Sequence, residues 1–232
     1  MKLVTVVALV VAAACAAQYR NLYQIDQPVP VSLEHGQYCV GVRLWGKGGV
    51  MARFAIGLFD RVTLGMSYSA DSLIGNGTPT GSRPRPEFQA RLALLEELGY
   101  VPDLVLGFES QGYDDCLDGE FVVREKGGYL CVGKTIDVTH TYCALGLSYW
   151  DGVNAFLAVN EQLPNRFEVI AEFDPALYDI PGHNWRGGFL NFGLAWSFAE
   201  RFRFAVALRD ILGNRDQTRQ NRVIDLSFSE RF

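Results

Sequence analysis

Histidine and cysteine, which build most metal and nucleophilic sites, are scarce in this chain of 232 residues, with three histidines and five cysteines. His35, His140 and His183 lie far apart, and no Cys-x-x-Cys motif accompanies them. Protein zinc sites need such ligands at short spacings. The sequence therefore predicts no metal site and no cofactor, and the three histidines are interpreted as polar loop residues.

Clusters of lysine and arginine are also missing. The net charge is −5, and the arginines are spread along the chain instead of gathered in one stretch. A nucleic-acid-binding surface needs concentrated positive charge, so nucleic acid is not expected as a partner. Hydrophobic residues make up 49% of the chain and charged residues 20%. This balance excludes a disordered chain and is typical of a globular or a membrane protein.

The longest apolar run lies at the N-terminus, in "MKLVTVVALVVAAACAAQ". It has Lys2, then apolar residues from Leu3 to Ala14, then small residues around Cys15. A membrane-spanning helix needs about 20 apolar residues. Residues 1–17 are therefore predicted to be the cleaved signal peptide of an exported protein rather than an anchor. Cleavage before Cys15 and lipidation of this cysteine stays open as an alternative.

Apolar residues recur at every second position through most of the chain. In "GGFLNFGLAWSF", Leu190, Phe192 and Leu194 alternate with polar or small residues, which predicts strand because successive side chains point to opposite faces. No helix is predicted. Alternation and turn residues together give twelve candidate strands, near 36–46, 50–58, 61–69, 86–95, 103–110, 127–136, 140–149, 153–161, 165–173, 187–198, 201–210 and 222–232.

The connections between these strands differ in length at their two ends. After even-numbered strands they are short, as at 59–60 and 199–200, and after odd-numbered strands several are long, as at 70–85 and 111–126. This sidedness is typical of outer-membrane barrels. The fold predicted is all-β, a closed antiparallel up-and-down transmembrane β-barrel of about 12 strands, with 10 strands as an alternative. A water-soluble barrel or sandwich is less favoured.

The barrel is assigned to residues 36–232, and residues 18–35 are assigned to a periplasmic N-terminal segment. Prolines punctuate that segment, so it either remains in the periplasm or tucks into the barrel mouth. The predicted location is the outer membrane of a Gram-negative bacterium, where a monomer would contact outer-membrane lipid and lipopolysaccharide.

The strand face opposite the apolar one carries charges of both signs together with many Gly and Ala residues. This mixture fits a crowded polar lumen of narrow conductance, in which arginines and carboxylates form interior ion pairs. The charged residues predicted to point into the lumen are Arg43, Arg53, Arg91, Glu109, Glu168, Glu172, Arg203, Arg209 and Asp225.

Four cysteines lie beyond Cys15. Cys131 and Cys143 fall on consecutive strands at positions that can face each other across a tight turn, which makes a disulfide between them one prediction. Thiols that are buried or face lipid are the alternative, and the sequence does not choose between the two.

The chain ends in "VIDLSFSERF". Ile224, Leu226 and Phe228, with the terminal Phe232, resemble the C-terminal strand that the barrel assembly machinery of the outer membrane recognises, so this machinery is an expected partner. Glu230 departs from the pattern, in which an apolar or aromatic residue is usual.

A wider resemblance covers nearly the whole mature chain. The segments "YQIDQPVPVSLEHGQYCVGVRLW", "GLFDRVTLGMSYSADSLIGNG", "RPEFQARLALLEE", "PDLVLGFESQGYD" and "GGYLCVGK" resemble those of a bacterial outer-membrane barrel family related to exopolysaccharide-biosynthesis (YjbH-like) barrel proteins, mostly of unassigned function. The resemblance implies a barrel, an outer-membrane location and a link to surface polysaccharide export components, and it supplies no catalytic residue.

Three functions follow from these observations. The favoured one is a structural or accessory barrel, not an enzyme, linked to surface polysaccharide export. The alternative is a narrow pore for small polar solutes. A lipid-modifying enzyme is less favoured, because it needs a nucleophile and a base in one patch and only His183, with Ser72, Ser82 or Ser110, is expected near the outer end.

Overall fold

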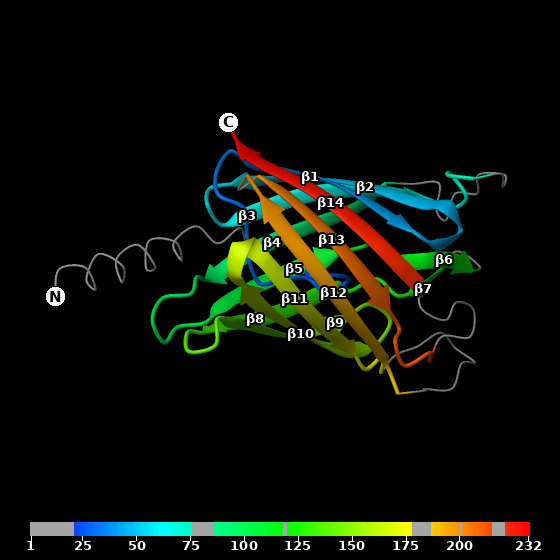
Figure 1. The fold of residues 1–232 in the computed structure, drawn as a ribbon. Helices are drawn as coiled ribbons and strands as arrows, with labels where there is room; N and C mark the ends of the chain where they lie inside the picture. The colour runs from blue at the N-terminus through cyan, green and yellow to red at the C-terminus, as the bar shows by residue number, and fades with distance from the viewer. Residues whose placement is uncertain (1–20, 76–85, 118–119, 178–186, 200, 215–220) are drawn as a thin grey trace.

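The computed structural model describes residues 21–75, 86–117, 120–177, 187–199, 201–214 and 221–232 (Figure 1). The predicted signal peptide, Cys15, Ser82 and His183 lie outside the described residues. Among the described residues no helix has the length and apolar character needed to cross a membrane.

Twelve antiparallel strands form one closed barrel, in which each strand pairs with the next barrel strand along the chain and β1 pairs with β14. The predicted fold class and strand number are confirmed. The barrel strands are β1 (Gln37–Trp45), β2 (Gly49–Leu58), β3 (Val62–Ala70), β4 (Glu87–Leu95), β5 (Asp103–Glu109), β8 (Gly127–Ile136), β9 (Thr141–Tyr149), β10 (Val153–Leu163), β11 (Phe167–Asp174), β12 (Phe189–Phe198), β13 (Phe202–Arg209) and β14 (Asn221–Arg231).

The apolar face of the strands is the outer face of the barrel. In β12, Phe192, Leu194 and Trp196 are 42%, 47% and 43% exposed, whereas Ala195 and Ser197 between them are buried. A soluble barrel would bury the apolar set instead. The large outward side chains of β11 to β14 also form a chain of ring contacts along the outer surface, linking Phe167, Trp196, Phe198, Phe202 and Phe228.

Short turns gather at one end of the barrel and longer loops at the other (Figure 1). The β2–β3 connection is a tight turn in which Phe59 and Asp60 both have positive φ, 55° and 59°, the backbone that matches the twist of a hairpin. The chain termini of the barrel, Gln37 and Arg231, are paired at the same short-turn end.

The N-terminal segment lies inside the barrel. Residues 22–31 are all buried, and the chain turns back on itself where Tyr23 bridges to Pro28 and the Val29 amide donates to the Leu22 carbonyl at 3.0 Å. Of the two placements considered for this segment, the structure shows the interior one for residues 22–31, and deeper than the mouth. Residues 21–33 are called the plug segment below.

A hairpin of β6 (Tyr113–Leu117) and β7 (Glu120–Val123) forms within the loop between β5 and β8. It stands at the long-loop end (Figure 1). The sequence predicted only an irregular loop there. Its first residue, Tyr113, lies over Arg43 of β1 and near Arg209 of β13, with 4.6 and 5.5 Å between the guanidinium carbons and the ring centroid. The base of the hairpin therefore reaches into the lumen.

The disulfide predicted between Cys131 and Cys143 is wrong, because both thiols are free. In the β8–β9 register Cys131 lies opposite Gly146 and Cys143 lies opposite Lys134. Cys131 is fully buried in the lumen. Cys143, flanked by the buried Tyr142 and Ala144, belongs to the other face of the sheet. Cys131 therefore occupies an inward position and Cys143 an outward one, so the barrel wall separates the two sulfurs.

Candidate functional site

The charged residues predicted for the lumen lie on its inward face. Arg43, Arg91, Glu109, Glu168, Glu172, Arg203 and Arg209 are each at most 5% exposed. Arg53 and Asp225 form an ion pair at 2.5 Å with side chains 11% and 17% exposed. Buried charges are strongly unfavourable unless they are paired and hydrogen-bonded, so their partners define the site.

Some of these partners come from other strands of the barrel, across the lumen or one strand away. Arg203 of β13 pairs with Glu168 of β11 at 3.2 Å. Lys126, just before β8, pairs with Asp174 at the end of β11 at 2.6 Å. The sequence did not indicate this second pair, because Lys126 and Asp174 fall in predicted loops.

Residues 25–27, called the tip of the plug segment below, surround one of these carboxylates. Glu172 accepts hydrogen bonds from three successive backbone N–H groups, those of Ile25 at 2.6 Å, Asp26 at 2.9 Å and Gln27 at 2.9 Å. Successive amides pointing at one carboxylate make an anion-binding concavity. The barrel wall therefore supplies the anion, and the plug supplies the donors.

At Asp26, also in the tip, the roles are exchanged: the plug supplies the anion and the barrel wall supplies the donors. Its carboxylate accepts from Arg43 at 2.7 Å and from Arg209 at 2.6 Å. Asp26, Arg43, Arg209 and Glu172 are each 1% exposed. Two wall arginines thus depend on a plug carboxylate for their charge balance, and sequence reasoning missed Asp26 as their partner.

Deeper toward the short-turn end, Tyr23 of the plug lies between two wall arginines. The guanidinium carbons of Arg53 and Arg91 are 4.7 and 4.6 Å from its ring centroid, within cation–π range. Its hydroxyl oxygen lies 2.7 Å from Glu109 Oε1. Arg91 also donates to the Leu22 carbonyl of the plug at 2.7 Å.

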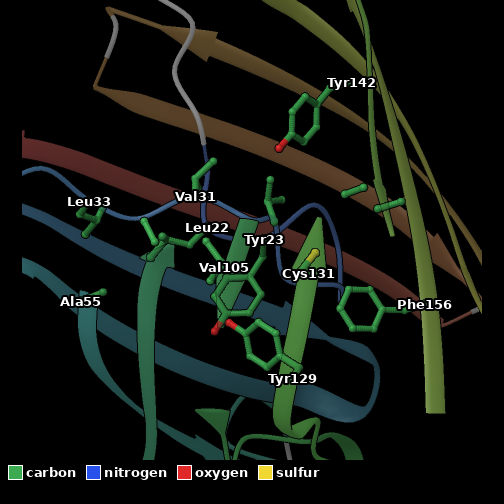
Figure 2. Close-up of a cluster of buried hydrophobic side chains, with 14 residues drawn as sticks. Leu22, Tyr23, Val31, Leu33, Ala55, Val105, Tyr129, Cys131, Tyr142 and Phe156 are labelled. Carbon is green, nitrogen blue, oxygen red and sulfur yellow. The ribbon is translucent and has the colours of Figure 1, made fainter. Parts of the chain in front are cut away.

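The base of the plug is held by apolar contact. Leu22, Val31 and Leu33 belong to a buried cluster with Val105 of β5, Tyr129 and Cys131 of β8 and Phe156 of β10 (Figure 2). In Figure 2 these wall side chains surround the plug backbone from several strands. Pro28 and Pro30 suit this position, because proline has no N–H group that burial would leave without a partner.

Together these contacts fill the middle of the lumen. The tip charges and, around Tyr23, Arg91 and Glu109 are almost without exposure, so the plug excludes solvent from them within the described part of the barrel. One signal in the sequence pointed to this packing. Tyr23 and Ile25, and then Val29, Val31 and Leu33, are apolar at alternate positions, which indicates an extended segment packed against a surface.

The described histidines do not assemble a catalytic site. His35 and His140 lie at the short-turn end, next to β1 and β9, and Ser72 lies in a long loop at the other end. The Ser110 hydroxyl donates to Glu87 at 2.6 Å. No group of three or more His, Cys, Asp or Glu residues suited to a metal occurs within the described ranges.

Comparison with solved structures shows what this barrel is similar to. A KdgM porin aligns with a TM-score of 0.53 at 8% identity, covering 83% of this chain and 98% of the porin. A KdgM porin in complex with disordered oligogalacturonate aligns equally well at 9% identity. These likenesses show the barrel fold. No protein-family model and no curated protein matches the chain, so the resemblance to exopolysaccharide-related barrels gains no support.

Proposed function

We propose that this protein is an outer-membrane pore for small polar solutes, closed at rest by its plug segment. The observation that carries the proposal is that the plug is separate from the barrel sheet but neutralises the charges of its inner wall. The plug contributes no strand to the closed sheet, yet its tip neutralises the wall charges through Asp26 and three backbone amides. Withdrawal of the plug leaves every strand pair of the barrel intact and opens a lumen lined by the charged wall residues.

The location in the outer membrane rests on the outer surface. An apolar belt surrounds a closed sheet, as in barrels that span lipid, and the fold is like that of KdgM porins. A closed sheet has no open edge for a second copy, which supports a monomer. The residues that we expect the barrel assembly machinery to recognise are the outward-facing Ile224, Leu226 and Phe228 and the terminal Phe232.

A barrel of twelve strands supports a narrow pore. Eight-stranded barrels are filled by their own side chains, whereas those of 16 to 18 strands leave a wide aqueous channel. Here additional material, the plug segment, fills the interior. The solutes proposed are therefore small, and the mixed charges of the wall favour polar ones over apolar ones.

A structural or accessory role, including one linked to polysaccharide export, is the competing proposal. One observation favours it: the plug is buried along most of its length, as a permanent core would be. The two proposals differ in whether removing the plug produces conductance.

The test is planar-bilayer recording of the mature protein and of a variant that lacks residues 18–33. We expect the mature protein to conduct little and the variant to show discrete openings of one size. Glu34→Gln is the matched control, because Glu34 lies just beyond the plug and pairs on the surface with Arg231, and it should behave like the parent protein.

Comparison of unheated and heated samples on a denaturing gel shows whether the plug-free variant still forms a barrel. A folded plug-free barrel with no conductance would leave the structural role standing and overturn the pore.

A further inference from the structure

A cavity lies at the long-loop side of the plug tip. Arg43, Trp45, Gln111, Tyr113 and Arg209 are among its lining residues. They come from the ends of β1 and β13 and from the loop that carries the β6–β7 hairpin. The cavity therefore stands between the outer loops and Asp26, on the path of a solute that enters from outside.

Two polar atoms at this cavity have no hydrogen-bond partner among the described residues. They are Arg43 Nη1 and the Tyr113 hydroxyl, on side chains only 1% and 6% exposed. Burial of a donor without a partner is unfavourable, and native proteins rarely leave such groups unexplained. Both atoms can donate a hydrogen bond, so the cavity is prepared for an acceptor.

The arginines already show which acceptor suits them. The other terminal nitrogen of Arg43, Nη2, donates to the Asp26 carboxylate at 2.7 Å, and Arg209 Nε donates to the same carboxylate at 2.6 Å. The Tyr113 ring lies over the Arg43 guanidinium at 4.6 Å and fixes its plane. A planar guanidinium with a free edge matches a carboxylate better than it matches a point charge.

We propose that this cavity binds small solutes that carry a carboxylate, with Arg43 Nη1 and the Tyr113 hydroxyl as donors. The proposal rests on the proposed pore and names its solute class. The carboxylate of Asp26 occupies the inner side of the same arginine pair. While the tip is in place the solute has only these two donors. When the tip withdraws, the nitrogens of Arg43 and Arg209 that held Asp26 also become donors for the solute. A bound solute therefore favours the withdrawn state, because a ligand shifts an equilibrium toward the state it binds better.

The test is isothermal titration of the refolded mature protein in detergent with sodium succinate, against sodium chloride at equal ionic strength. We expect saturable succinate binding and none of glucose. Tyr113→Phe keeps the ring and removes the hydroxyl, so we expect binding about tenfold weaker. Asp26→Asn removes the competing charge, and we expect binding about tenfold tighter.

Arg231→Gln is the control, because Arg231 is an exposed arginine at the short-turn end, and its affinity should equal that of the parent. A purely structural role for Asp26 would not make binding tighter. No saturable binding by either the parent or the Asp26→Asn protein would overturn the proposal, as would equal affinity for inorganic phosphate. Either result would leave the conductance of the plug-free barrel, and with it the pore, untouched.

Discussion

The base and the tip of the plug segment are held in the same barrel by different interactions. At the base, Leu22, Val31 and Leu33 pack in an apolar cluster with the wall. At the tip, Asp26 and three backbone amides bind charged wall residues. Apolar contact is non-directional and changes little with solutes, whereas an ion that enters the lumen as far as the tip competes for its ion pairs. The difference indicates that the base anchors the plug and the tip responds to what enters the lumen.

The largest expected effect comes from removing the tip carboxylate. Asp26→Ala leaves Arg43 and Arg209 buried without their shared partner. Breaking a buried ion pair on one side costs about 3–5 kcal/mol. We expect the tip to leave the lumen, which raises bilayer conductance toward that of the plug-free variant. The urea midpoint of the refolded protein should also fall. Unchanged conductance and an unchanged midpoint would show that the tip does not depend on this carboxylate.

The corresponding change at the base is Leu22→Ala. Leu22 is 4% exposed within the apolar cluster, and truncation of a buried leucine costs about 2–5 kcal/mol. We expect the lower end of this range, because the plug segment is not a strand of the barrel sheet and can shift to reduce the cavity. The base should loosen while the tip pairs persist.

The rate at which a thiol reagent labels Cys131 measures the loosening of the base directly. The Cys131 sulfur is fully buried and lies 3.7 Å from the Pro28 carbonyl oxygen. In a background with the other cysteines replaced by serine, a water-soluble maleimide should label Cys131 faster after Leu22→Ala than in the parent. Asp26→Ala should raise conductance more than it raises labelling. If both variants changed both measurements equally, the plug would move as one unit and the distinction between base and tip would be lost.

The sequence predicted the strands of the barrel far better than the interactions that fill its lumen, for a physical reason. Strand alternation is local and has period two, so Phe192 and Leu194 reveal their shared face without knowledge of any partner. Asp26 bonds to Arg209, 183 positions away, and no local pattern carries that information. The lumen charges were predicted because each lies within an alternating strand. Lys126 was missed because it precedes β8, and Asp174 because it is the last residue of β11, one position beyond the predicted strand.

The cysteine error has the same origin. Cys131 and Cys143 were placed on the correct strands, but pairing them required the register across the β8–β9 turn. Register depends on turn geometry, and an odd offset moves a side chain to the opposite face. The β6–β7 hairpin was likewise missed, since its contacts with Arg43 and Arg209 come from distant strands.

The smallest expected effect concerns an ion pair outside the lumen, which serves as the reference for the buried ones. Glu97, in the β4–β5 connection, accepts from Lys134 Nζ at 2.7 Å, and the Lys134 and Glu97 side chains are 36% and 11% exposed, against at most 2% for the pairs of Asp26. Partial burial raises the pKa of Glu97, but hydrogen bonds from Lys134 and Thr135 outweigh burial, so its pKa lies below the ordinary value. Exposed pairs contribute at most about 1 kcal/mol.

Because the pKa of Glu97 is lower in the folded state, its contribution is complete above the unfolded pKa of about 4.3 and is lost as pH falls through the folded pKa. The urea midpoints of the parent and of Glu97→Gln should therefore differ slightly at about pH 7 and converge as the pH is lowered below the unfolded pKa of Glu97. If Glu97→Gln lowered the urea midpoint at neutral pH as much as Asp26→Ala does, burial would not account for the difference between the two classes of ion pair. The strength of the plug tip would then need a cause other than its exclusion from water.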